Sequence, residues 1–196
     1  MPEFIKATID NIDEIATIHK NAFSKSHFTS FFSLSLLEKY YEFFLEGDSE
    51  TWLQKNDEGE ILGFVVFGEN LGNTIKEFKS QYKTEIIKTA VLNPAASISK
   101  VLSNVYYRFL SKNDSFDETK SLILSIAVNG KGKGTGSKLL SFVSEYNTKK
   151  NLNEVGLYVR ADSAYAVNFY LKNEYKIQAY TSGLYYMERV NLSKVE

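Results

Sequence analysis

The 196-residue chain contains no cysteine and only two histidines, His19 and His27. The absence of cysteine excludes disulfides, thiolate metal ligands and a cysteine nucleophile. Two histidines are too few for a metal site built from several imidazoles, so we expect no bound metal. Only two prolines and eleven glycines are present, a composition that argues against a disordered chain.

Long apolar runs and a large net charge are also missing. The longest apolar run, residues 61–67, is interrupted by Gly63 and is much too short to span a bilayer. The formal net charge is −1, which gives no electrostatic basis for nucleic-acid binding. Met1-Pro2-Glu3 lacks the basic and apolar regions of a signal peptide. We therefore expect a cytoplasmic protein without nucleic-acid or membrane partners.

The most informative stretch is a predicted strand, a glycine-rich loop and a predicted helix. Residues 119–128 alternate in hydrophobicity, and the alternation places the apolar side chains on one face: Leu122, Leu124, Ile126 and Val128. Residues 137–149 form a helical face at i, i+3, i+4, i+7: Leu139, Phe142, Val143 and Tyr146. In the loop 129–136, glycines alternate with Lys131, Lys133 and Thr135.

Such a loop suits a phosphate or pyrophosphate. Glycines let backbone N–H groups converge on one point without side chains in the way. A helix N-terminus adds partial positive charge, and Lys131 and Lys133 add full charges. A Walker loop is excluded because neither Gly-Lys pair is followed by Ser or Thr, and a Gly-x-Gly-x-x-Gly dinucleotide loop would need glycine at Thr135 or Ser137.

The hexapeptide Lys131-Gly132-Lys133-Gly134-Thr135-Gly136 fits a third pattern: basic or Gln, x, x, Gly, x, Gly or Ala. It resembles the coenzyme A pyrophosphate loop of the GNAT superfamily of N-acetyltransferases, in which Arg or Gln usually holds the first position. Lys131 can supply charge there but not a bidentate fork. The alternative interpretation is an ordinary turn between a strand and a helix.

A second stretch strengthens the resemblance. Residues 157–160 read as a strand, and residues 163–176 resemble the superfamily pattern Asn-x-x-Ala-x-x-Phe-Tyr followed by a basic residue and Gly-Phe. Three positions match by spacing: Ala166, Phe169 and Tyr170. Ser163 stands where Asn is usual and has a shorter reach, while Glu174-Tyr175 replaces Gly-Phe. Two motifs in the expected order are more specific than either alone.

The resemblance implies an α/β (α+β) fold: a mixed, mostly antiparallel sheet of about seven strands flanked by helices. Its fourth and fifth strands, here 119–128 and 154–160, splay apart around the pantetheine arm of acetyl-CoA. A backbone N–H near Val128 would polarise the thioester carbonyl. The cofactor-binding residues that the resemblance implies are Ile126, Ala127, Val128, Lys131, Gly132, Lys133, Gly134, Thr135, Gly136, Ser137, Ser163, Ala166 and Phe169.

The motif position also implies that Tyr170 is the general acid, because a phenol can protonate the departing thiolate. A structural tyrosine on an apolar helix face is the alternative. The residue that deprotonates the amine is left open among His27, Glu69, Glu118 and a water molecule. His19, on an apolar helix face, is expected to be a packed core-edge histidine.

The remaining pattern predicts one domain, 1–196, with a helical insertion at about 71–118 between the third and fourth strands. Asp10 is the expected N-cap of the first helix, and capping boxes are expected at Ser35–Glu38 and Thr74–Glu77. Helices are expected from Thr74 to about Leu92 and from about 95 to 110.

The leading function is transfer of an acetyl group from acetyl-CoA to a small-molecule primary amine, with an amino sugar as a faint analogy. Aromatic side chains in the 24–46 region could stack on a sugar but fit a core better. The first alternative is a non-catalytic acyl-CoA-binding or sensor domain, and the second is a different nucleotide-binding domain. The sequence leaves a homodimer open.

Overall fold

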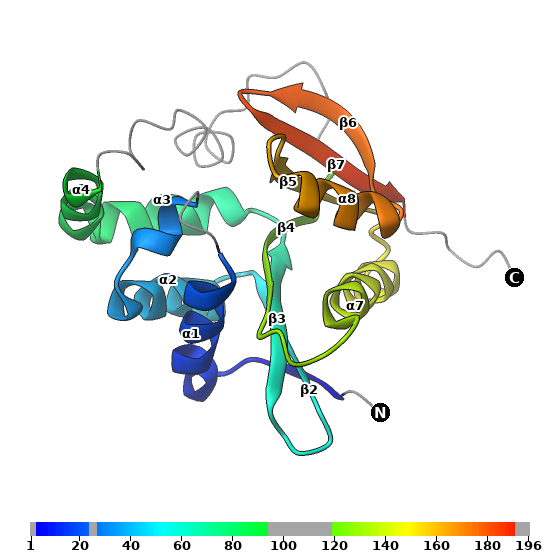
Figure 1. The fold of residues 1–196 in the computed structure, drawn as a ribbon, viewed down its shortest axis with the longest axis horizontal. Helices are drawn as coiled ribbons and strands as arrows, with labels where there is room; N and C mark the ends of the chain where they lie inside the picture. The colour runs from blue at the N-terminus through cyan, green and yellow to red at the C-terminus, as the bar shows by residue number, and fades with distance from the viewer. Residues whose placement is uncertain (1–2, 24–26, 94–118, 191–196) are drawn as a thin grey trace, which may run out of the picture.

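The computed structural model describes residues 3–23, 27–93 and 119–190, which build one seven-stranded sheet flanked by helices (Figure 1). The strands are β1 (Glu3–Lys6), β2 (Glu50–Lys55), β3 (Ile61–Gly68), β4 (Leu122–Val128), β5 (Glu154–Arg160), β6 (Lys176–Thr181) and β7 (Leu184–Val190). The helices are α1 (Ile12–Ala22), α2 (Leu34–Glu46), α3 (Leu71–Gln81), α4 (Lys83–Leu92), α7 (Thr135–Lys149) and α8 (Ala164–Lys172), with 3-10 turns η1 (Ile9–Asn11) and η2 (Phe28–Phe31). This architecture confirms the predicted fold class.

The strands lie in the order β1-β2-β3-β4-β5-β7-β6, and every neighbouring pair is antiparallel except β4 and β5. Within these described strands, β4 and β5 share two registered pairs, Leu122 with Gly156 and Ile123 with Leu157. Beyond these pairs, β4 stays with β3 and β5 stays with β7 to their last residues. The two strands therefore diverge, as the resemblance implies.

A β-bulge interrupts β4 at Leu124. Val66 and Phe67 are neighbours in β3, yet they pair with Ser125 and Ile123, so Leu124 is an extra residue in β4. A bulge resets the alternation of side chains along a strand. Ser125 consequently lies on the side of the sheet that α2 covers.

The bulge contradicts one sequence prediction about β4. Alternation predicts that the apolar residues 122, 124, 126 and 128 share one face. The structure packs Leu122 and Leu124 against the core of α1, α2 and α3, whereas Ile126 and Val128 pack against the core of α7 and α8. A period of two fails here because one inserted residue moves every following side chain to the opposite face.

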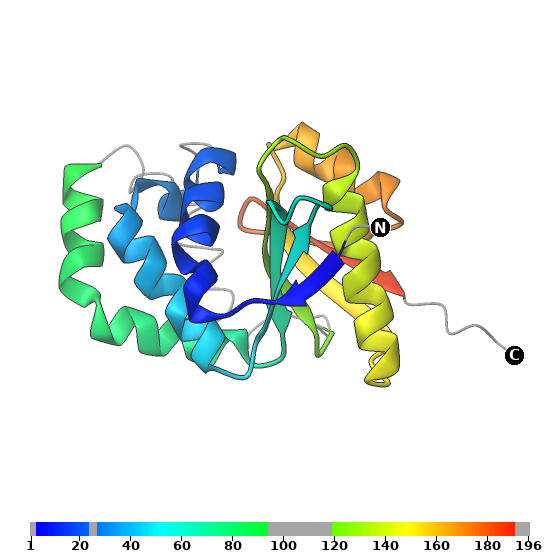
Figure 2. The ribbon, with the colours of Figure 1, turned by 90° about the horizontal axis from the view of Figure 1, so that it is seen from below.

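Helices cover both faces of the sheet (Figure 2). α1 to α4 lie on one face, and α7 and α8 lie on the other. The predicted inner face of α7 is confirmed, since Leu139 and Val143 are fully buried and Phe142 and Tyr146 pack against the same core. The gap between β4 and β5 thus opens between two packed layers.

Three helices begin at residues other than those expected from the predicted caps. α1 starts beyond Asp10, which lies in η1. α2 is capped by Ser33 rather than Ser35, because the Ser33 side chain accepts the backbone N–H of the third following residue at 3.1 Å. Thr74 lies inside α3 instead of capping it. Several Ser, Thr, Asn or Asp residues lie near each of these helix starts, so capping chemistry alone does not select one of them.

The described part of the segment between β3 and β4 is helical over most of residues 71–92. The expected single helix from Thr74 to Leu92 is two helices, α3 and α4, which meet at Tyr82. The helix expected at 95–110 and the linker at 111–118 lie outside the described residues. None of the helices in the described part of the chain combines the length and apolar character needed to cross a membrane.

Gly156 anchors the junction of β4 and β5, and we expect its replacement by alanine to loosen it. An added Cβ would lie 2.6 Å from Tyr186 Oη and 2.9 Å from a Leu122 methyl, and Tyr186 is fully buried. Overpacking of this kind lowers the unfolding free energy by about 2 kcal/mol. Urea unfolding measures this loss of unfolding free energy. The control is Ser141→Ala at an exposed position of α7, which should change the unfolding free energy by less than about 0.5 kcal/mol. Equal stability of the two variants would contradict the tight junction.

Candidate active site

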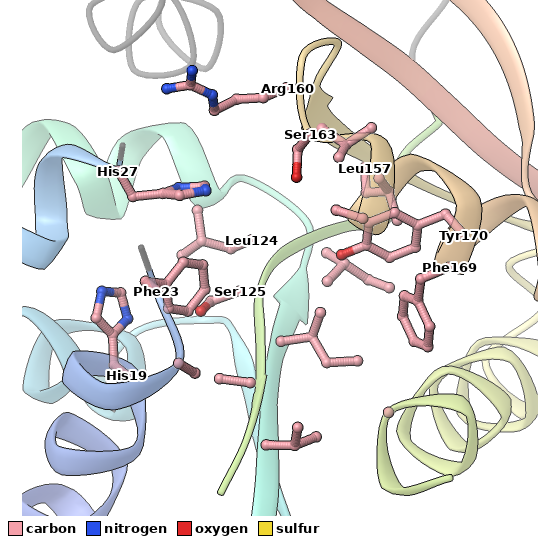
Figure 3. Close-up of a pocket in the computed structure, with 18 of the residues that line it drawn as sticks. His19, Phe23, His27, Leu124, Ser125, Leu157, Arg160, Ser163, Phe169 and Tyr170 are labelled. Carbon is pink, nitrogen blue, oxygen red and sulfur yellow. The ribbon is translucent and has the colours of Figure 1, made fainter. Parts of the chain in front are cut away.

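A cavity of about 710 Å³ lies where β4 and β5 diverge (Figure 3). The C-terminal halves of both strands line it, together with the N-terminus of α7, one face of α8, and side chains from α1, η2 and α2. Its volume is typical of a small-molecule site. Because β4 and β5 have no mutual pairs in this region, their facing backbone groups can hydrogen-bond to a ligand in the cavity.

The glycine loop shapes one end of this cavity. Gly130 and Gly134 have φ of 81° and 76°, a left-handed conformation that favours glycine. Gly134 is the N-cap of α7 and provides no capping side chain, and the first amides of a helix have no acceptor within the helix. An added Cβ at Gly136 would come within 2.9 Å of Phe169 Cζ. The loop thus exposes backbone amides, and glycine keeps the space beside Phe169 open.

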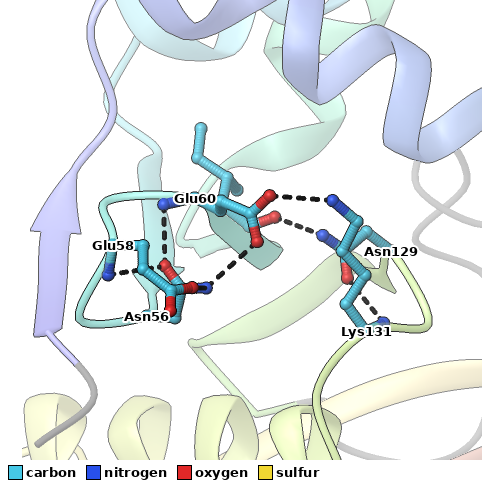
Figure 4. A network of polar contacts seen from close by, with 6 residues as sticks. Asn56, Glu58, Glu60, Asn129 and Lys131 are labelled. Carbon is cyan, nitrogen blue, oxygen red and sulfur yellow. Dashed lines mark hydrogen bonds and ion pairs between the residues drawn. The ribbon is translucent and has the colours of Figure 1, made fainter.

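Lys131 is directed away from the cavity. Its Nζ lies 2.9 Å from Glu60 Oε1 on the β2–β3 hairpin, in the network of Figure 4. Asn129 fixes the start of the loop to β3, since its Nδ2 donates to the Ile61 carbonyl at 2.6 Å and its Oδ1 accepts the Lys131 N–H at 2.9 Å. Glu60 raises the pKa of Lys131 through their hydrogen bond. Both side chains are exposed, so this pair contributes little to stability.

α8 presents Tyr170 to the cavity. The hydroxyl points from α8 toward β4 in Figure 3, and the ring packs edge-on against Phe169 and Tyr175. Burial raises the pKa of Tyr170 above its ordinary value, so the phenol keeps its proton at neutral pH. Ser163 precedes α8 and lines the cavity without capping the helix through its side chain.

The other end of the cavity holds both histidines. His19 is 2% exposed, with Nδ1 2.6 Å from Tyr41 Oη and Nε2 3.0 Å from Thr29 Oγ1. Burial first, and then nearby positive charge, lowers the pKa of His19 to about 3. Burial and Arg160 lower the pKa of His27 to about 4. Both imidazoles are therefore neutral at physiological pH.

The expected packed histidine at position 19 is confirmed, but the sequence gave no sign that it would also line the cavity. Of the three side chains considered for deprotonating the amine, His27 lines the cavity. Glu69 is exposed and does not line it, and Glu118 lies outside the described residues. Arg160, at the end of β5, was not singled out from the sequence; it lines the cavity and forms an ion pair with Asp162.

The structure gathers most of the predicted site residues around one cavity. Its lining includes twelve of them: Ile126, Ala127, Val128, Gly132, Gly134, Thr135, Gly136, Ser137, Ser163, Ala166, Phe169 and Tyr170. The two lysines of the loop, Lys131 and Lys133, are not among the lining residues. Within the described ranges, no group of three or more His, Asp or Glu side chains could hold a metal ion.

The buried neutral histidines make stability depend on pH. Below a pH of about 6.5 each histidine binds a proton in the unfolded chain but stays neutral in the folded chain until the pH is much lower. The unfolding free energy therefore falls as pH falls. For His19 the slope approaches about 1.4 kcal/mol per pH unit between about pH 6 and pH 5. The unfolding free energy, measured with urea at several pH values, should depend correspondingly less on pH in His19→Gln. The same slope in wild type and variant would contradict a neutral buried imidazole.

No protein-family model matches the chain, and no curated protein matches it in sequence. Three solved structures illustrate what it is similar to. The PaiA N-acetyltransferase of Thermoplasma acidophilum, in complex with coenzyme A, has a TM-score of 0.56 at 14% identity, over 97% of this chain and 99% of that one. The ribosomal-protein-S18-alanine N-acetyltransferase of Escherichia coli has a TM-score of 0.57 at 13% identity, over 100% and 97%.

The third structure is the spermidine/spermine N-acetyltransferase SpeG of Vibrio cholerae, in mutant forms, with a TM-score of 0.54 at 13% identity over 97% of this chain and 95% of that one. At identities this low, the similarity is evidence for a shared fold alone. The likeness extends over nearly the whole length of each chain, so it covers the sheet and the helices on both of its faces. The chain therefore shares the fold of these three N-acetyltransferases.

Proposed function

We propose that the chain is an acetyl-CoA-dependent N-acetyltransferase that moves an acetyl group to a primary amine by direct attack. One observation carries the proposal: the facing edges of β4 and β5 open onto a cavity that reaches both the glycine N-terminus of α7 and Tyr170. A strand edge, a row of helix amides and a phenol suit the three parts of an acyl-CoA, namely the amide-rich arm, the pyrophosphate and the sulfur.

The residues around the cavity fit the coenzyme. The amides of Thr135, Gly136 and Ser137 would bind pyrophosphate oxygens, and a side chain in place of Gly136 would fill the space beside Phe169. Backbone groups of β4 near Ile126 would pair with the arm. The coenzyme supplies an activated acetyl thioester. The amine-binding end lies toward α1 and η2, on the opposite side of β4 from α7.

Lys131 would bind pyrophosphate only after leaving Glu60. Their ion pair is exposed, so the exchange requires little free energy. Lys133 carries the second charge of the loop. The alternative function is a domain that binds acyl-CoA without turnover. Lys131 favours this alternative because it replaces the usual arginine or glutamine of the motif.

Tyr170 would act as the general acid. Its raised pKa keeps the hydroxyl protonated, and its position on α8 directs that proton into the cavity near β4. The expelled thiolate would take this proton as the amide forms. Nearby backbone N–H groups of β4 would stabilise the charge that develops on the carbonyl oxygen.

The acceptor is proposed to be a small primary amine rather than a polyamine. Among the described residues, the cavity lining includes no Asp or Glu, whereas a polyamine would need carboxylates opposite its cationic groups. Of the aromatics considered for stacking, Phe28 and Tyr40 line the cavity, while Phe32 and Tyr41 are fully buried. These two rings in the cavity lining keep an amino sugar as one candidate. Similar structures include enzymes for spermidine and for a ribosomal protein, so the neighbours do not choose between acceptor classes. A cytoplasmic location and a homodimer stay predictions.

Tyr170→Phe should lower kcat about 100-fold and leave the KM for acetyl-CoA nearly unchanged, since the ring remains and only the proton donor is lost. Thiol release over a panel of amines measures both constants. The matched control is Tyr175→Phe: this hydroxyl is buried next to Tyr170 and has no hydrogen-bond partner among the described residues. Full turnover by Tyr170→Phe would remove the acid role. Coenzyme binding by wild type without transfer to any amine would favour the non-catalytic domain.

A further inference from the structure

Four polar side chains form a continuous hydrogen-bonded chain on the acceptor side of the cavity. Ser125 Oγ lies 3.2 Å from Tyr41 Oη, Tyr41 Oη lies 2.6 Å from His19 Nδ1, and His19 Nε2 lies 3.0 Å from Thr29 Oγ1. The four residues come from β4, α2, α1 and η2. No stretch of the sequence shows them together, because the contacts join residues 22 and 84 positions apart as well as 10.

The two end hydroxyls of this hydrogen-bonded series line the cavity, and the two side chains between them are buried. Ser125 and Thr29 both line the cavity, as does an edge of His19, while Tyr41 is fully buried and His19 is 2% exposed. The β-bulge at Leu124 puts Ser125 on this side of the sheet. Figure 3 shows Ser125 on the same side of β4 as Phe23 and His19, with Tyr170 on the other.

Each member of the chain can both give and take a proton. A hydroxyl donates one hydrogen bond and accepts others, and a neutral imidazole donates from one nitrogen and accepts at the other. The arrangement is consistent when Ser125 donates to Tyr41, Tyr41 donates to His19 Nδ1, and His19 Nε2–H donates to Thr29. A lone buried imidazole held only for packing would not need hydroxyls that reach the cavity at both ends.

We propose that Ser125, Tyr41, His19 and Thr29 form a proton relay that removes the proton which the acceptor amine loses during acetyl transfer. The inference rests on the proposed function. Ser125 would contact the amine, and Tyr41 and His19 would act through it as positioning and relaying residues. The relay would supply the base that the sequence leaves open among single side chains and a water molecule.

The relay conserves protons and charge. The amine N–H bond breaks as Ser125 Oγ gains that proton, and the former Ser125 proton passes to Tyr41 Oη. The former Tyr41 proton passes to His19 Nδ1, the His19 Nε2 proton passes to Thr29 Oγ1, and the former Thr29 proton leaves to water. No member ends with a charge, and the imidazole ends in its other tautomer.

The surroundings of His19 favour such neutral transfer. Besides Tyr41, which is hydrogen-bonded to it, two charged or titratable groups act on His19, namely Lys20 on the same helix and His27 across Phe23. The Lys20 ammonium binds the carbonyls of Ser30 and Phe32 at 2.7 and 2.5 Å. Both groups disfavour an imidazolium at His19. His27, which also lines the cavity, is the rival that could take the proton directly.

The test is the pH profile of acetyl transfer by the full chain with variants that interrupt the relay. Tyr41→Phe keeps the ring, and His19→Gln keeps a donor and an acceptor but cannot relay a proton. Both should lower kcat about 100-fold near neutral pH, change KM less than about threefold, and recover as pH rises toward the pKa of the amine. Ser125→Ala should behave alike, and Ser125→Thr should restore turnover.

Tyr146→Phe is the matched control, because it removes a tyrosine hydroxyl whose 2.5 Å bond to Glu50 lies on the α7 side of the sheet, away from the cavity. Its kcat should match wild type at every pH. Relay variants that keep wild-type kcat, or lose it equally at all pH values, would overturn the relay. So would a pH-dependent loss confined to His27→Gln. A wild type that acetylates no amine would overturn the proposed function and the relay with it.

Discussion

The divergence of β4 from β5 is the constraint on which the site depends. Parallel strands normally satisfy each other's backbone groups, but here the shared register ends after Ile123 and Leu157. Unpaired backbone edges inside a protein require water or a ligand, so the sheet itself creates a binding groove. The glycine loop follows β4 directly, and α8 follows β5, so both continue from the two walls of this groove.

The bulge at Leu124 determines which β4 side chains face each side of the sheet. After the bulge, Ile126 and Val128 face α7 and α8, where the coenzyme is proposed to bind. Ser125 faces α1 and α2, where the amine is proposed to enter. In the proposed function, one inserted residue would thus let a single strand present its backbone to the coenzyme and a side chain to the amine.

Local patterns predicted the elements because they depend on neighbours in sequence. The strand-loop-helix unit around Gly134 followed from periodicity and glycine placement, and the start of α8 at Ala164 followed from the motif resemblance. The face of β4 could not be predicted, since a bulge depends on the register with β3. Lys131 was expected at the phosphate site because nothing local marks Glu60, which is 71 residues away in sequence, as its partner. His19 looked like an ordinary core residue because its link to Ser125 runs through Tyr41 on another helix.

Thermal unfolding in the presence of acetyl-CoA, ATP or NAD tests the central claim most directly. A ligand at a hundred times its dissociation constant adds about 2.7 kcal/mol to stability. The account predicts a melting shift with acetyl-CoA alone. It also predicts loss of that shift in Gly136→Val, whose side chain would meet Phe169, and its persistence in Ser141→Val, an exposed position on the same helix that does not line the cavity. A shift with ATP or NAD, no shift with acetyl-CoA, or an intact shift in Gly136→Val would contradict a coenzyme site between β4 and β5.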